Sequence, residues 1–252
     1  MIRAILARAK QGHRTTKYPK EPAQLPELLR GYPRLNSAAC PEGCRECIDA
    51  CPYGAISRTP VLSIDMGKCL FCSACSRACS HGAIEMTCDA ALAANKREEL
   101  IVREGEERRM ARALDAKMLA LFGRSLKFRE VSAAGCNACE ADTNVLSTIG
   151  WDLGRFGIQF VASPRHADGL WVTGPVSENM YQALLLTYEA IPAPKIVVAC
   201  GACAINGGPF LDSPECRNGI DNIFPVDLYI PGCPPHPVTI LDGLLRLLDK
   251  MG

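Results

Sequence analysis

Short apolar runs alternate with helical stretches over the second half of the chain, from about Leu126 onward. The strand-like runs are LKFREVS, IQFVAS, GLWVTG, KIVVAC and VDLYIPG. Helices are predicted near residues 139–153 and 176–190, and VTILDGLLRLLDKM predicts a last helix at the end of the chain. Strands that alternate with helices are typical of an α/β layer fold, so we expect a mostly parallel sheet over residues 126–252.

A segment of different texture precedes these strands. Residues 89–125 are rich in Ala, Leu, Glu, Arg and Lys. Apolar positions toward the end of the segment keep helical spacing: Met110, Leu114, Met118 and Leu121. We interpret residues 91–125 as a helical linker, which is semi-rigid and holds two domains at a fixed separation.

An internal repeat marks the first half of the chain. The run ECIDACPYGAI, from Glu46, recurs 28 residues later as ACSRACSHGAI, from Ala74. A duplicated unit predicts pseudo-two-fold symmetry, and each half is too small to bury a core alone. We therefore expect a small domain over residues 35–90 in which metal clusters serve as the core.

Charge is distributed unevenly, although the formal net charge of the 252 residues is only +1. Residues 1–34 hold eight Lys or Arg against Glu21 and Glu27. This basic N-terminal arm suits an anionic membrane surface or an acidic partner, or is simply a solvated tail. Nucleic acid is the least favoured partner, because the arm lacks interleaved aromatic residues. The sequence shows no secretory leader and no apolar run of the roughly 18 residues that a membrane span needs.

Eight of the fifteen cysteines form two runs with the spacing of iron–sulfur ligands. The second run, from Cys69 to Cys79, matches the bacterial ferredoxin run at every gap, and in that pattern the fourth cysteine ligates the other cluster. The predicted ligands are Cys40, Cys44, Cys47 and Cys79 for a first 4Fe-4S cluster, and Cys69, Cys72, Cys75 and Cys51 for a second. One extra residue lies between Cys40 and Cys44, and we expect Gly43 to absorb it. Zinc favours paired knuckles, which interlocked triplets fit poorly, and a leaderless chain disfavours disulfides.

The remaining cysteines follow predicted strands. Cys136 and Cys139 follow the first strand, Cys200 and Cys203 the fourth, and Cys233 the fifth. Open α/β sheets build their sites outside the carboxyl ends of strands, so we expect these loops to converge. From spacing alone, the pair at residues 136 and 139 is also compatible with a redox dithiol or half a zinc site. Cys203 lies in a glycine-bounded loop, whereas Cys200 ends an apolar strand and is predicted to be a buried thiol; Cys88 and Cys216 are predicted to be structural.

These residues carry a family resemblance that covers nearly the whole chain. The N-terminal part, with its YP and RGYPRL segments and double cysteine run, resembles the two-cluster ferredoxin subunit of formate hydrogenlyase and respiratory complex I. From FGRSLKFREV onward, the GCNACE, ASPRHAD, GACAINGG and PGCPP segments resemble the small subunit of group 4 NiFe hydrogenases and its complex I relative. The resemblance implies that two subunits are fused here: an α+β ferredoxin-like domain and a flavodoxin-like α/β domain.

The resemblance also implies a third 4Fe-4S cluster, held by Cys136, Cys139, Cys203 and Cys233 beside the active site of a large subunit. The complex I subunit has adjacent cysteines in its first loop, whereas the spacing of Cys136 and Cys139 is of the hydrogenase kind. No nickel motif is present, so the chain is expected to have no catalytic centre of its own. The implied function is electron transfer through three clusters in a membrane-associated hydrogenase. The alternative is the same role in a non-hydrogenase, complex I-like oxidoreductase linked to quinone or ion translocation.

The partners that the resemblance implies are a NiFe-type large catalytic subunit, membrane-arm subunits and a redox protein such as formate dehydrogenase, CO dehydrogenase or ferredoxin. The implied location is the cytoplasmic side of the membrane, as a peripheral subunit. Three further residues are ambiguous. Glu140 either stabilises a helix N-terminus, which we favour, or relays protons. Arg165 and His166 face a partner, donate hydrogen bonds near the third cluster, or lie in a solvated loop.

Overall fold

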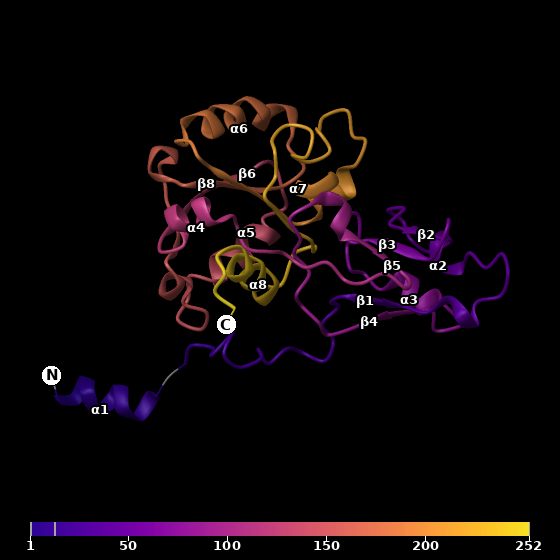
Figure 1. Cartoon of the computed structure of the whole chain (residues 1–252), viewed down its shortest axis with the longest axis horizontal. Helices are drawn as coiled ribbons and strands as arrows, with labels where there is room; N and C mark the ends of the chain where they lie inside the picture. Colours follow the sequence, from indigo (N-terminus) through magenta and orange to yellow (C-terminus); the bar gives the residue numbers. More distant parts are fainter. Residues whose placement is uncertain (1, 13, 252) are drawn as a thin grey trace.

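A five-stranded parallel sheet forms the centre of the C-terminal part in the computed structural model, which describes residues 2–12 and 14–251 (Figure 1). Its strands are β6 (Leu126–Ser132), β7 (Ile158–Phe160), β8 (Gly169–Thr173), β9 (Ile196–Cys200) and β10 (Leu228–Ile230). The strand order is β10-β9-β8-β6-β7, and every neighbouring pair is parallel. All five strands lie within the runs predicted from the sequence, and the mostly parallel sheet is confirmed.

Helices cover both faces of this sheet. They are α4 (Ala116–Phe122), α5 (Ala138–Val145), α6 (Glu178–Ala190), α7 (Ala202–Asn206) and α8 (Pro237–Leu247). Short 3₁₀ turns connect them at Leu153–Phe156 (η3), Pro164–His166 (η4) and Gly208–Phe210 (η5). Figure 1 shows α6 above the sheet and α8 below it. Because both faces are covered, every residue of β8 and β9 is buried, which explains why their sequences are continuous apolar runs.

The side chains of β9 show how one strand serves two cores. Val197 and Ala199 point into the core on the α6 side, and Val198 and Cys200 point into the core on the α8 side. Leu184 of α6 fills the first core, whereas Leu244 of α8 fills the second. The helix expected over residues 139–153 ends at Val145, because the chain then makes a series of turns.

The N-terminal part contains two small antiparallel sheets. One pairs β1 (Pro33–Leu35) with β4 (Ile84–Met86), and the other has the order β2-β3-β5, with β2 (Ile56–Ser57), β3 (Ser63–Asp65) and β5 (Ile101–Arg103). Two short helices, α2 (Glu46–Asp49) and α3 (Ala74–Ala78), follow equivalent positions of the sequence repeat and contact each other. The 3₁₀ turns η1 (Ser37–Ala39) and η2 (Arg97–Leu100) complete this part.

The segment predicted as a helical linker is mostly not helical. Of residues 91–125, only η2 and α4 are helical, and α4 begins at Ala116 and not near Met110. Asp115 caps α4, since its carboxylate accepts hydrogen bonds from the backbone N–H groups of Lys117 and Met118. Upstream, β5 pairs with β3, so part of the segment completes a sheet that begins before residue 66.

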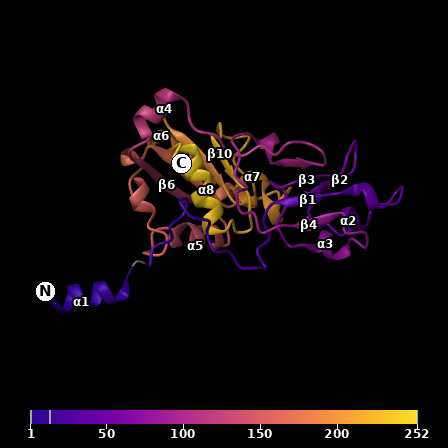
Figure 2. The same ribbon diagram turned by 60° about the horizontal axis from the view of Figure 1, so that its bottom comes forward.

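The two parts share a hydrophobic core. Met66, Phe71 and Leu100 of the N-terminal part lie in the same buried cluster as Val172 and Val197 of the parallel sheet. The backbone joins the parts as well: Ala94 and Tyr229 exchange N–H···O bonds of 3.1 and 2.8 Å along the edge of β10. The parts therefore pack as one body, extended along its long axis as Figures 1 and 2 show.

The helix α1 (Ile2–Gln11) projects from this body, and none of its described residues is buried (Figure 2). The chain returns to the body at Thr16, whose N–H donates to the carbonyl of Gly150 at 2.8 Å. Among the described residues, no helix is both long enough and apolar enough to span a bilayer.

Candidate metal centres

Cysteines from the two runs lie in two interlocked sets, which we call the first and second thiol sets. Burial raises the pKa of Cys47, and the nearby Cys79 and Cys44 thiols raise it further. Cys40 has the same two neighbours. The first set thus contains three cysteines of the first run and Cys79 of the second.

The second set mirrors the first. Burial raises the pKa of Cys69 to about 12, and Cys75, Cys51 and Cys72 each raise it further through charge repulsion. These four thiols line a single cavity, whose other walls include Ile56, Ile64 and Met86. The structure therefore brings together the two foursomes that the sequence predicts, including the exchange of Cys51 and Cys79 between runs.

Backbone N–H groups point at several of these sulfurs. Ala55 donates to Cys51 Sγ at 3.3 Å, and Ala83 donates to Cys79 Sγ at 3.2 Å. These bonds occupy equivalent positions of the repeat, 28 residues apart. Hydrogen bonds to ligand sulfurs are one of the means by which iron–sulfur proteins set reduction potential.

The longer first loop of this part is held by two residues. Gly43 adopts a φ of +76°, a left-handed conformation that accommodates the extra residue between the first two cysteines. Arg58 closes the loop from outside, because its guanidinium donates to the carbonyl oxygen of Cys44 at 3.0 Å. Sequence reasoning missed Arg58, since it lies 14 residues beyond the loop that it contacts.

The third thiol set lies at the carboxyl edge of the parallel sheet. Cys136 follows β6, Cys139 is in the first turn of α5, Cys203 is in the first turn of α7, and Cys233 follows β10. Burial raises the pKa of Cys139, and the thiols of Cys203, Cys233 and Cys136 add to the increase. Burial raises the pKa of Cys203 to about 12, and the neighbouring thiols of Cys233 and Cys136 raise it further. The three predicted loops therefore converge.

Glycines leave room beside the third set. A Cβ atom at Gly201 would lie 2.5 Å from Cys139 Sγ, and one at Gly208 would lie 2.9 Å from Cys203 Sγ. Both glycines have positive φ, of 89° and 52°. Four thiols around a backbone that carries no side chain at these points fit an iron–sulfur cluster.

Cys200 is separate from the set in its environment. It is fully buried in the core on the α8 side, which confirms the prediction of a buried thiol. Burial raises the pKa of Cys200 well above its usual range, and the nearby Cys139 thiol raises it further. Cys88 is exposed, with its Sγ 3.5 Å from the carbonyl oxygen of Glu27, and Cys216 lies on an isolated bridge to Ser177.

Two carboxylates lie behind the third set. Glu140 is in the first turn of α5, as expected, but it is 7% exposed and its Oε1 accepts a 2.6 Å hydrogen bond from Thr173 Oγ1 of β8. Glu130 of β6 is its neighbour, and burial, followed by the charge of Glu140, raises the pKa of Glu130 to about 7. Oε1 of Glu130 is buried without a hydrogen-bond partner among the described residues. Nothing in the strand sequence distinguishes Glu130 from its charged neighbours Lys127 and Arg129.

Arg165 and His166 lie away from the cysteines. They form η4, which precedes β8, and they line a hollow with Lys127 and Pro194. Lys127 is near the start of β6, and Pro194 precedes β9, so the hollow is at the amino edge of the sheet. The proposal that these residues donate hydrogen bonds near the third cluster is therefore wrong.

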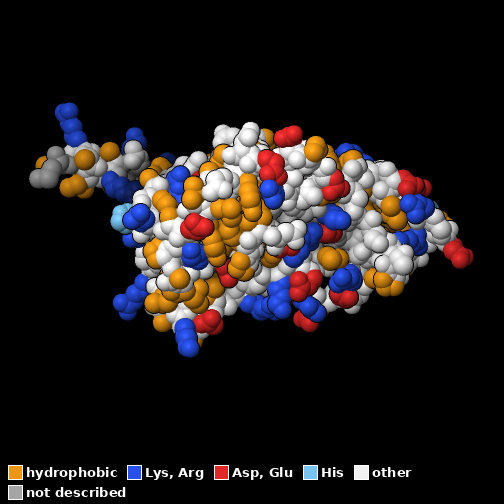
Figure 3. Space-filling model, turned by 90° about the horizontal axis from the view of Figure 1, so that it is seen from above, with side chains coloured by type: hydrophobic (Ala, Val, Ile, Leu, Met, Phe, Trp, Pro, Cys, Tyr) orange, Lys and Arg blue, Asp and Glu red, His pale blue; other side chains and the backbone are white. Residues whose placement is uncertain are grey.

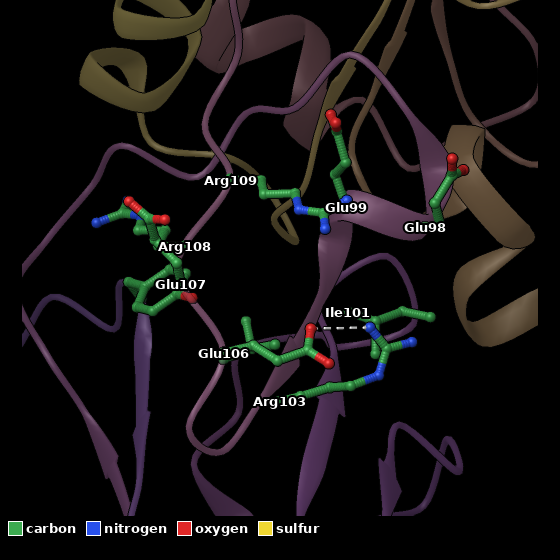
Figure 4. Close-up of a pocket in the computed structure, with 10 residues that line it drawn as sticks. Glu98, Glu99, Ile101, Arg103, Glu106, Glu107, Arg108 and Arg109 are labelled. Atoms are coloured by element: carbon green, nitrogen blue, oxygen red, sulfur yellow. Dashed lines mark hydrogen bonds and ion pairs between the residues drawn. The ribbon is translucent and has the colours of Figure 1, made fainter.

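A cavity of about 150 Å³ lies near Tyr32 in the N-terminal part (Figure 4). Its charged residues are mixed in sign: Glu98, Glu99, Glu106 and Glu107 against Arg103, Arg108 and Arg109. Arg103 pairs with Glu106 at 3.3 Å, as the dashed line in Figure 4 marks, and Arg108 stacks on the ring of Tyr32. The lining mixes four acidic with three basic residues, so the cavity carries no clear ligand preference.

One further group of possible ligands escaped the sequence analysis. Atoms of Cys44, Glu46 and His81 lie within 4.8 Å of one another. Glu46 already accepts hydrogen bonds from the backbone N–H and the hydroxyl of Ser80, at 3.0 and 2.8 Å. Cys44 belongs to the first thiol set, so this group is an exposed rim of that set.

Comparison with known proteins separates the two parts in the same way. The family of the NADH ubiquinone oxidoreductase 20 Kd subunit matches residues 136–247, and a 4Fe-4S binding domain matches residues 62–85. The second match covers one of the two copies of the repeat.

The matching proteins are subunits of respiratory and hydrogenase complexes. A probable membrane-bound hydrogenase subunit of Pyrococcus furiosus, mbhJ, is 41% identical over 146 residues, which are 58% of this chain and 87% of that protein. An NADH-quinone oxidoreductase subunit of Citrifermentans bemidjiense is 47% identical over 46% of this chain and 68% of its own length. A solved structure of the membrane-bound sulfane sulfur reductase, an archaeal respiratory membrane complex, aligns with a TM-score of 0.47 at 34% identity, over 55% of this chain and 76% of that one. The chain therefore belongs to the family of the 20 Kd subunit of NADH ubiquinone oxidoreductase, together with subunits of membrane-bound hydrogenases, and it carries a 4Fe-4S binding domain.

Proposed function

We propose that the chain is the electron-transfer subunit of a membrane-associated NiFe hydrogenase complex. In this proposal it holds three 4Fe-4S clusters between a redox donor or acceptor and a catalytic large subunit. The observation that supports it most is the grouping of twelve thiols into three sets of four, two of them interlocked. A bound 4Fe-4S cluster supplies a site that takes up and releases one electron.

The proposed ligands are the three thiol sets. They are Cys40, Cys44, Cys47 and Cys79; Cys51, Cys69, Cys72 and Cys75; and Cys136, Cys139, Cys203 and Cys233. Burial raises the pKa of Cys69, Cys139 and Cys203, which favours their protonated form until iron binds. Assembly of the clusters is then coupled to the release of protons.

One cavity is lined both by residues that follow Cys69 of the second set and by Cys233 of the third, which supports an order for the electron path. Leu70 and Phe71, directly after Cys69, line the cavity together with Cys233 and Pro234. Phe71 is 8% exposed, and its N–H donates to Cys69 Sγ at 3.3 Å. These residues connect the second set to the third through protein, which leaves the first set at the far end for the redox partner.

The large subunit is proposed to cover the carboxyl edge of the parallel sheet. Cys136 and Cys233 are exposed there, although cluster ligands are usually shielded from water. The proposal makes the chain a fusion of a two-cluster ferredoxin-type subunit with a hydrogenase small subunit, peripheral to the membrane on its cytoplasmic side. Membrane-arm subunits and a redox protein complete the proposed partners.

A second function is the same electron transfer in a complex I-like oxidoreductase that lacks nickel. The relatives named as subunits of NADH-quinone oxidoreductase favour it. The two residues between Cys136 and Cys139 favour the hydrogenase. Purification of the complex from its source separates the two functions: nickel in the large subunit and hydrogen-dependent reduction of the clusters support the hydrogenase, and their absence supports the alternative.

Iron analysis tests the cluster assignment itself. The chain purified without oxygen is expected to contain about twelve irons and twelve sulfides, because each cluster holds four of each. Replacement of Cys203 by Ser is expected to remove about four irons and one electron paramagnetic resonance signal. Cys200→Ser is expected to retain all three signals, as is the matched exposed control Cys88→Ser.

Two results contradict the assignment. About eight irons in the unmodified chain exclude a cluster at the third set. Loss of a signal in Cys200→Ser, with full iron content in Cys203→Ser, makes Cys200 the ligand.

A further inference from the structure

The helix α1 has an apolar face that contacts nothing in the described part of the chain. Ile2, Ile5 and Leu6 are 75%, 67% and 63% exposed, and no residue of α1 is buried. With Ala9 they follow the spacing i, i+3, i+4 and i+7, which aligns them in one stripe along the helix. Figure 3 shows α1 standing clear of the body, with hydrophobic and basic side chains on its surface.

Basic residues border this stripe on both sides. At about 100° per residue, Arg3 and Lys10 lie along one flank and Arg8 along the other. No acidic residue occurs before Glu21, so the helix and the segment that follows it carry a single sign of charge. The opposite face of the helix presents the small side chains of Ala4 and Ala7.

The segment after the helix is fixed to the C-terminal part. The hydroxyl of Thr15 donates to the carbonyl of Ile149 at 2.7 Å, and the hydroxyl of Tyr18 donates to Asp242 Oδ1 at 2.6 Å. Ile149 is itself 77% exposed. An exposed apolar side chain therefore lies on the body at the point from which the basic, amphipathic helix departs.

We propose that α1 binds in the plane of an anionic lipid surface, with Ile2, Ile5 and Leu6 in the acyl boundary and the basic flanks at the headgroups. A large apolar stripe with Lys and Arg on the polar side is the pattern of helices that lie in a membrane interface. The fixed segment at Thr15–Tyr18 then sets which side of the protein faces the membrane, namely the side of the α5–η3 loop. This role does not depend on which clusters the chain holds.

The charge pattern favours lipid over a groove on a partner protein. The stripe contains only aliphatic residues, whereas protein interfaces concentrate their binding energy in Trp, Tyr and Arg anchors within the contact. Basic residues continue beyond the helix at Arg14, Lys17 and Lys20. Lys17 alone among these three is paired, with the exposed Glu21 at 2.7 Å. A row of positively charged side chains suits the diffuse negative charge of an anionic lipid surface.

Vesicle flotation of the full chain tests this proposal. The chain is expected to float with vesicles of phosphatidylcholine and phosphatidylglycerol, and to bind much less to pure phosphatidylcholine or in high salt. The double variant Ile5→Ser, Leu6→Ser is expected to bind at least about tenfold more weakly, because it removes apolar area from the stripe. Neutralising Arg3, Arg8 and Lys10 with Gln is expected to cost about fivefold per charge. In the bound state, hydrogen exchange of residues 2–11 slows.

The double variant Ala4→Ser, Ala7→Ser is the matched control. It makes the same kind of change on the opposite face and is expected to bind within about twofold of the wild type, because it leaves the stripe intact. All variants keep their iron content, since α1 contacts no thiol set, and this separates the test from that of the electron-transfer function. Absence of vesicle binding, or equal binding by the stripe variant and the control, overturns the proposal. Loss of a membrane-arm subunit by the stripe variant, with vesicle binding unchanged, assigns the stripe to a protein groove and overturns it as well.

Discussion

Glu130 and Glu140 place two carboxyl groups behind the third thiol set, and their environments differ. Glu140 is satisfied by a hydrogen bond from the hydroxyl of Thr173. Glu130 has an oxygen with no partner in the described part of the chain, and its pKa is raised to about 7 by burial and by Glu140. Glu130 is therefore expected to keep its proton up to about pH 7.

Replacement of Glu130 by Gln is expected to stabilise the protein above neutral pH. The unfolded carboxyl loses its proton near pH 4.5, whereas the folded one keeps it until about pH 7. Stability contributed by this group is thus complete below pH 4.5 and is lost as the pH rises toward 7, because the unfolded state binds fewer protons there. The variant removes this loss, so its unfolding free energy should exceed that of the wild type by about 1 kcal/mol at high pH, after allowance for partial solvent screening.

Denaturant unfolding between about pH 4.5 and pH 9, with clusters retained, measures this difference. Glu85→Gln is the control, because Glu85 lies exposed on β4 in a surface pair with Arg34 at 2.9 Å. Parallel stability curves for Glu130→Gln and the wild type over this range disprove the raised pKa.

At the scale of elements, the features that depend on local sequence patterns were predicted, and those that depend on distant backbone partners were not. The five strands of the parallel sheet were predictable because each is a short run bounded by turn residues. Cys51 lies near cysteines of the second run and Cys79 near cysteines of the first, as the local ferredoxin spacing predicts. The helix expected from Met110 begins only at Ala116, because the N–H groups of Ala111 and Leu114 donate to the carbonyls of Ala93 and Leu247. No periodicity within the segment reports those distant partners. Glu130 was missed because the strand pattern does not report which of its charged residues is buried beside Glu140.

The turn between β9 and α7 requires a glycine at position 201. Gly201 has φ +89° and ψ +157°, a region that is essentially restricted to glycine. A side chain at this position also meets Cys139 Sγ at 2.5 Å. Gly201→Ala is therefore expected to cost about 1–3 kcal/mol in strain and to displace Cys139, with loss of the third cluster and retention of the other two.

Iron content and electron paramagnetic resonance of Gly201→Ala measure that loss. Gly54→Ala is the matched control: Gly54 also has a positive φ, of 59°, but a Cβ there meets nothing within 4 Å. Full iron content and three signals in Gly201→Ala would refute the proposed crowding of Cys139.

At the scale of the whole molecule, the shared core makes the two parts mechanically dependent. Met66 and Phe71 flank Cys69 of the second set, and they pack in one cluster with Val172 and Val197 of the parallel sheet. Asp65 and Arg97 add a two-pronged ion pair, with contacts of 2.8 and 2.7 Å, at the base of the N-terminal part. The proposed electron transfer between the second and third thiol sets depends on the distance that this shared core maintains.

Leu100→Ala tests this dependence, because Leu100 is fully buried in the shared core and its carbonyl accepts from the N–H of Met66 at 2.9 Å. The change is expected to cost about 2–5 kcal/mol, the range for a buried Leu, and to lower the unfolding temperature of both parts together. Loss of cluster absorbance reports the N-terminal part, and hydrogen exchange of β9 reports the sheet. Val61→Ala, at a position 39% exposed in the same part, is expected to change neither signal. If cluster absorbance falls early in Leu100→Ala while β9 stays as protected as in the wild type, the parts unfold independently, and the fixed spacing must then come from a partner subunit.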